Sequence, residues 1–122
     1  MRSQLVLLIL LLGPQTAAFS QNWDQIRSTA ERQHEMVMLL IRNRDFGRVL
    51  EASRQIFSLG FPPSQEHLLV QEGRILSEAL ARNQQFQLAE ALLDQALRAV
   101  RSNPSKIDLF KELKSEYASP KT

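Results

Sequence analysis

The chain has no cysteine among its 122 residues, so it forms no disulfide and offers no thiolate nucleophile. It also lacks an N-glycosylation sequon, because the one candidate, Asn103-Pro104-Ser105, carries the forbidden proline. Basic residues exceed acidic ones only by 15 to 13, which leaves no electrostatic footprint for nucleic acid. A glycine-rich phosphate loop and a Gly-x-Ser-x-Gly elbow are missing as well, so we expect no enzymatic activity and no cofactor.

The longest apolar run lies at the N-terminus. Arg2 precedes the run Leu5–Leu12, and a Gly-Pro pair and small residues follow it, which is the pattern of a cleavable secretory signal peptide. The run is too short to cross a bilayer, which takes about 20 apolar residues. It is also not amphipathic, as a buried core helix would be. We therefore expect residues 1–18 to be a signal peptide, cut at Ala18 or Ser20, with no membrane span after cleavage.

Removal of this segment leaves 104 residues with a formal charge of +1. A chain of this length can form one modest hydrophobic core without disulfides or structural metals. Small exported domains in eukaryotes usually rely on disulfides. The missing cysteines and sequon therefore favour a bacterial protein, exported to the periplasm or the outside.

Helical periodicity and helix-breaking residues predict an all-α domain over residues 22–117, followed by a disordered tail over 118–122. Asn22, Ser64 and Asn103 are the expected N-caps, and Gly60 is expected to end a helix in the left-handed conformation. The expected helices run from about Trp23 to Arg42, Asp45 to Leu59, Gln65 to Arg82, Phe86 to Arg101 and Pro104 to Tyr117.

The helical segments recur along the sequence with a period of 40 residues. A shift of 40 residues lays Arg42-Asn43-Arg44-Asp45-Phe46 on Arg82-Asn83-Gln84-Gln85-Phe86. This match predicts two antiparallel helix hairpins that stack on a common core, with Gly73 marking a close approach of helices. Two alternatives stay open: two ordinary Arg-Asn helix ends, or an up-and-down bundle with a structural or oligomeric role in the cell envelope.

The second unit resembles the tetratricopeptide repeat (TPR). The spacing Phe86, Ala89, Leu93 and Ala96 is similar to that of the second helix of this family, and a proline closes the unit. The resemblance covers about Gln71 to Pro104, and less closely Glu31 to Pro63. It implies a right-handed stack, with a concave face that holds an extended peptide or a helix of another protein.

Carried over to this chain, the resemblance implies a partner-binding face built from the first helix of each hairpin. Arg42 and Arg82 are the strongest candidates, since a guanidinium fork can hold a partner's carboxylate, although both could simply stabilise helix C-termini. The fifth helix is expected to cap one end of the stack and self-association to cover the other. The implied face comprises Glu31, His34, Met38, Arg42, Gln71, Arg74, Glu78 and Arg82.

Two further patterns concern metal ions and charged partners. Glu31-x-x-His34 has the spacing of di-iron bundle ligands, but the second such motif is missing, so no metal site is predicted. Four arginines between positions 42 and 54 could meet an acidic partner or anionic lipid. Asp45 and Glu51 lie among them, which favours a mutually compensated, solvated surface.

Overall fold

The described part of the chain consists of helices joined by short turns. In the computed structural model it covers residues 15–100 and 104–118, with side chains from 22–100 and 108–118, and contains no strand. The all-α prediction is confirmed. The helices are α2 (Gln15–Arg42), α3 (Val49–Phe57), α4 (Glu66–Arg82), α5 (Phe86–Ala99) and α6 (Pro104–Ala118), and the short 3-10 turns are η1 (Phe46–Arg48) and η2 (Pro63–Gln65).

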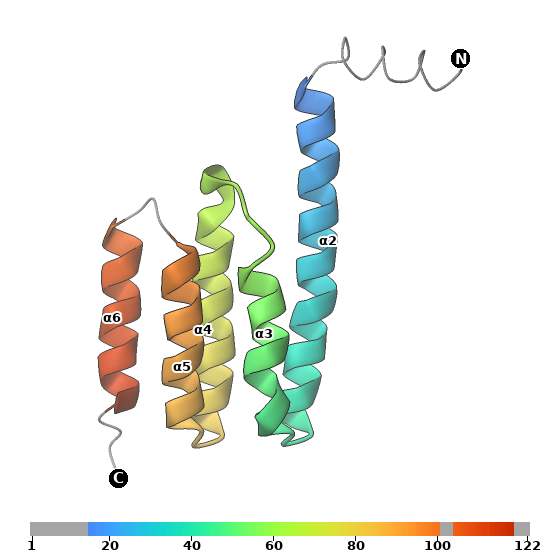
Figure 1. Ribbon diagram of the computed structural model, residues 1–122. Helices are drawn as coiled ribbons and strands as arrows, with labels where there is room; N and C mark the ends of the chain where they lie inside the picture. Colours follow the sequence, from blue (N-terminus) through green and yellow to red (C-terminus); the bar gives the residue numbers. More distant parts are fainter. Residues whose placement is uncertain (1–14, 101–103, 119–122) are drawn as a thin grey trace.

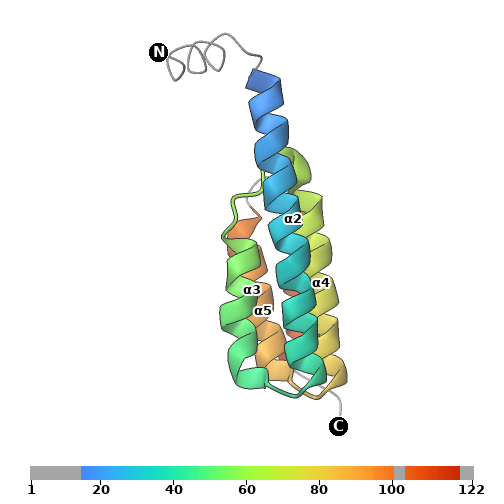
Figure 2. The same ribbon diagram turned by 90° about the vertical axis from the view of Figure 1, so that its right-hand side faces the viewer.

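Successive helices run antiparallel and form two stacked hairpins with a capping helix (Figure 1). The first hairpin is α2 with α3, and the second is α4 with α5. They stack with α2 against α4 and α3 against α5, so that α2 has a neighbour on each of two sides (Figure 2). Helix α6 packs on α5 and α4 and closes the end of the row opposite α2.

The turns inside the two hairpins have the same backbone conformation. Arg44 and Gln84, 40 residues apart, both adopt left-handed φ values, 60° and 59°. The residue after each donates its backbone N–H to a leucine carbonyl five positions back, at 2.8 Å from Asp45 to Leu40 and 2.9 Å from Gln85 to Leu80. Both joints are therefore Schellman-type helix ends with a non-glycine residue at the left-handed position.

The core lies between the hairpins and under α6. Its largest fully buried side chains are Phe110, Ile56, Leu69, Leu76, Leu80, Leu92 and Leu93. Gly73 of α4 is buried, and a Cβ atom there would lie 2.9 Å from the Cβ atom of Ala96 on α5. The predicted close approach of helices at Gly73 is confirmed.

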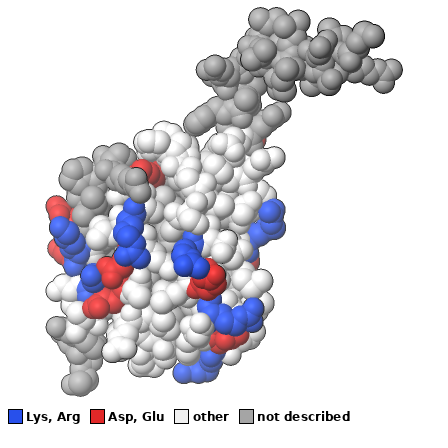
Figure 3. Space-filling model, viewed as in Figure 1, with Lys and Arg blue, Asp and Glu red and all other residues white. Residues whose placement is uncertain are grey.

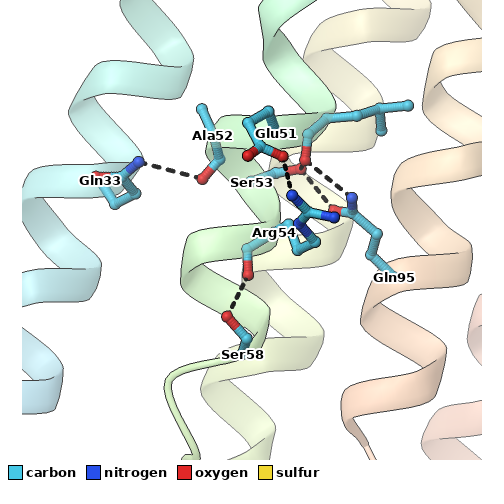
Figure 4. A network of polar contacts seen from close by, with 8 residues as sticks. Gln33, Glu51, Ala52, Ser53, Arg54, Ser58 and Gln95 are labelled. Carbon is cyan, nitrogen blue, oxygen red and sulfur yellow. Dashed lines mark hydrogen bonds and ion pairs between the residues drawn. The ribbon is translucent and has the colours of Figure 1, made fainter.

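Side-chain hydrogen bonds tie neighbouring helices together at mid-height (Figure 4). Gln33 of α2 donates to the carbonyl of Ala52 on α3 at 3.3 Å. The fully buried Ser53 of α3 donates to Oε1 of Gln95 on α5 at 2.6 Å, and the Gln95 amide donates to the Leu50 carbonyl at 2.9 Å. A buried polar group is stable only when it is bonded in this way, so Ser53 and Gln95 fix the register of α3 on α5.

Several predicted helix ends need correction. Helix α2 begins at Gln15, so Asn22 lies inside it and is not its N-cap. Ser64 lies in η2, and α4 begins after Gln65 with no side-chain cap. Gly60 has φ 78°, which confirms its predicted left-handed conformation, but it does not end the helix, because α3 ends at Phe57 with Ser58 as its C-cap. Asn103, residues 1–14 of the predicted signal peptide and residues 119–122 of the predicted tail lie outside the described residues.

Candidate functional site

A groove of about 540 Å³ runs between α2 and α4, the two helices that lie side by side in Figure 2. We call it the α2–α4 groove. It is lined by Arg27, Ala30, Glu31, His34, Glu35, Ile56, Phe61, Leu68, Gln71, Glu72 and Ile75.

The floor of the groove is apolar. Phe61, just after the left-handed Gly60, meets the ring of Trp23 edge to face, with centroids 5.2 Å apart, and this contact holds the loop against α2. Leu68 is half-buried, whereas Ile75 leaves 44% of its surface exposed. Burying an exposed apolar side chain away from water is favourable, so the floor can bind an apolar group.

One polar pair crosses the groove. Nδ1 of His34 on α2 lies 2.6 Å from Oε2 of Glu72 on α4, and the side chains are only 26% and 16% exposed. Burial raises the pKa of the Glu72 carboxyl, and the hydrogen bond and charge of His34 partly offset that rise. The pair therefore fixes the register of the two helices while holding a carboxylate in a partly desolvated place.

The raised pKa of Glu72 gives a testable pH dependence. A carboxyl whose pKa is higher in the folded chain favours folding when protonated, and this contribution is lost as the pH rises through the folded pKa. Glu72→Gln keeps a neutral hydrogen-bonding side chain. We expect it to match the natural chain in unfolding free energy at acidic pH and to exceed it at neutral pH.

Urea unfolding followed by circular dichroism at both pH values measures this difference. Glu112→Gln, on the exposed side of α6, is the matched control and should show no pH-dependent gain. A difference between Glu72→Gln and the natural chain that is the same at both pH values would contradict the assignment.

The rim on α2 carries carboxylates that lack partners in the structure. Glu31 and Glu35 are exposed, one turn apart, and make no ion pair or hydrogen bond with the described side chains. Arg27, the basic residue of this rim, instead lies 3.7 Å from Asp24. Gln71 faces them from α4. The rim is thus acidic and able to receive a cation.

Comparison with protein-family models, curated proteins and solved structures finds no match. The geometry of the groove is therefore the observation on which a function must rest.

The groove brings together part of the predicted partner-binding face. Glu31, His34 and Gln71 all line it. Met38 packs against the core beside it. The remaining residues lie elsewhere: Arg42 is exposed at the C-terminal end of α2, Arg74 lies 3.8 Å from Glu78, and Glu78 and Arg82 line a shallow depression against α6.

Sequence reasoning missed the residues that make the groove apolar. Ile75 is exposed, whereas Leu69, Leu76, Ala79 and Leu80 form the buried stripe of the same helix. A large aliphatic residue off the core stripe, on a helix that is otherwise charged there, is the feature that could have identified it. Glu72 carried no comparable feature, because only the packing of α2 on α4 gives it a partner.

Other chemistries find no support in the part of the chain described. Within it, no three His, Cys, Asp or Glu side chains gather where a metal could bind, and no helix is long and apolar enough to cross a membrane. Two of the arginines after position 42 are paired with carboxylates: Arg48 lies 3.4 Å from Asp45, and Arg54 pairs with Glu51. Arg44 instead lies over the ring of Phe46. Basic and acidic side chains alternate on the face shown in Figure 3.

Proposed function

We propose that this chain is an exported, non-enzymatic protein-interaction module that holds a segment of a partner protein in the α2–α4 groove. The observation that carries the proposal is an apolar floor, with Ile75 44% exposed, beside the rim carboxylates of Glu31 and Glu35, which pair with none of the described side chains. The stacked hairpins and their matching joints support a TPR-like arrangement. The N-terminal sequence supports export, and the missing cysteines support a bacterial periplasmic or extracellular location.

The chemistry of the groove defines the partner segment. Large apolar side chains would cover Phe61, Leu68 and Ile75, and a lysine or arginine would meet the carboxylate of Glu31. The helix-in-groove mode of recognition uses such a combination, with apolar anchors one helical turn apart. We therefore infer a basic amphipathic segment as the partner, rather than the acidic one that Arg42 and Arg82 would select.

Selection from a random peptide library tests this proposal without a known partner. We expect the chain to enrich peptides that combine basic residues with large apolar ones. Ile75→Glu, which places a charge in the apolar floor, and Glu31→Lys, which reverses the rim charge, should each weaken binding of an enriched peptide about tenfold or more.

Glu112→Lys on α6 makes the same charge reversal far from the groove and should bind as the natural chain does. Circular dichroism checks that each variant keeps its helices. Enrichment of acidic peptides, or binding that survives both groove variants, would contradict the proposal.

A further inference from the structure

The two ends of the helix row differ. Helix α6 covers one end, whereas the outer side of α2 and α3 at the other end has no neighbour among the described helices (Figure 1). Met36 and Leu39 of α2 are each 45% exposed at this end, whereas Val37, Leu40 and Ile41 of the same apolar run are buried. We call this surface the open end.

The open end has a hollow beside its exposed apolar side chains. This depression, of about 440 Å³, lies between α2 and α3 and is lined by the apolar Met36, Leu40 and Ala52, by Gly47, and by the polar or charged Gln33, Arg48, Glu51 and Gln55. Gly47 contributes no side chain that would fill this space. A projecting methionine or leucine of a second surface could therefore enter it.

Charge complementarity identifies the occupant. Met36 and Leu39 have the spacing of the a and d positions of a heptad, and Glu35 and Arg42, seven residues apart, share a g position on one flank. Both are exposed, and neither makes an ion pair or hydrogen bond with the described side chains. In an antiparallel pair of identical helices, g positions face g positions, so Glu35 of each copy meets Arg42 of the other.

The same antiparallel pairing also places the apolar residues of the two copies opposite each other. When Met36 of one copy lies opposite Leu39 of the other, Glu35 and Arg42 are offset by two residues, about 3 Å along the axis, which their long side chains can span. In a parallel pair, Glu35 would instead face the e position, Leu40. The antiparallel arrangement is thus the one that pairs both charges.

From these observations we propose that the open end binds the open end of a second copy of this chain about a two-fold axis, with the two α2 helices antiparallel. Glu35 and Arg42 form two symmetric ion pairs at the edges of this interface, and Met36 and Leu39 form its centre. Of the residues that line the groove, Glu35 takes part in this interface, whereas Glu31 and Ile75 do not.

Sedimentation equilibrium of the purified chain tests the interface. We expect a monomer–dimer equilibrium in which Glu35→Arg or Arg42→Glu alone weakens dimerisation about tenfold, because like charges then face each other twice. The double variant Glu35→Arg with Arg42→Glu should restore it. Glu112→Arg, the same reversal on α6 at the opposite end of the row, should leave dimerisation unchanged.

Several results would overturn the proposal. They are a chain that stays monomeric at every concentration, association beyond the dimer, or a double variant that fails to regain the dimer although its helicity is intact. If the groove variants lose peptide binding but still dimerise, that result bears on the proposed function of the groove and not on the dimer interface.

Discussion

Replacing Gly73 with valine is expected to lower the unfolding free energy by about 3 kcal/mol, the cost of overpacking a close-packed core. A Cβ atom at this position would lie 2.9 Å from the Cβ atom of Ala96 and 3.2 Å from the ring of Phe110, so α4, α5 and α6 would all have to separate. The gain in helix propensity on replacing glycine, about 1 kcal/mol, is too small to offset this cost. Urea unfolding followed by circular dichroism measures the difference.

A double-mutant cycle isolates the contact responsible. Gly73→Ala alone should be destabilising, because its methyl group meets that of Ala96. Ala96→Gly, destabilising in the natural chain, should become much less so when Gly73→Ala is present, since the two methyl groups then no longer compete. Additive effects of the two changes, or a stabilising Gly73→Ala, would show that the helices are less closely packed than the structure shows.

Phe110→Ala is expected to cost about 3–5 kcal/mol, the usual penalty for emptying a buried aromatic site. Phe110 is 1% exposed and is the most deeply buried side chain of α6, which also packs Leu109, Leu113 and Tyr117 against the core. Its polar contacts are Lys114 with Asp94 at 2.8 Å and Tyr117 with Ser77 at 3.4 Å. Those polar contacts are too weak to hold the helix once the ring is removed. We therefore expect α6 to detach from α4 and α5.

Hydrogen exchange and urea unfolding together test this expectation. The amides of α6 should lose protection in Phe110→Ala, while those of α4 and α5 keep more of theirs. Phe110→Leu, which retains most of the apolar volume, is the matched control and should cost much less. Full protection of α6 in Phe110→Ala would contradict its assigned role as the capping helix.

The elements of the fold could be predicted because they depend on local chemistry. Gly60 adopts a left-handed conformation that a side chain disfavours, and Gly73 marks the place where helices come closest. The start of α2 could not be predicted in the same way. An N-cap at Asn22 would contribute only about 1 kcal/mol, and helix continuation from Gln15 outweighs it.

The site was predicted in part, and the reason is geometric. Helical spacing puts Glu31 and His34 on one face of α2, and the groove contains both. The partner of His34 depends on how α2 slides along α4, which no local pattern determines. Glu72 was missed for that reason, and Arg82 lies beside α6, outside the groove.

The two matching joints have a consequence for how such a chain could grow. Because the backbone turns in the same way at Arg44 and at Gln84, residues 45–84 begin and end on equivalent geometry. A duplicate of this stretch inserted after Gln84 would leave the existing hairpins in place and lengthen the row by one unit. The chain thus contains a repeatable module. Gene duplication or protein engineering could change the number of hairpins in the row without redesigning a single turn.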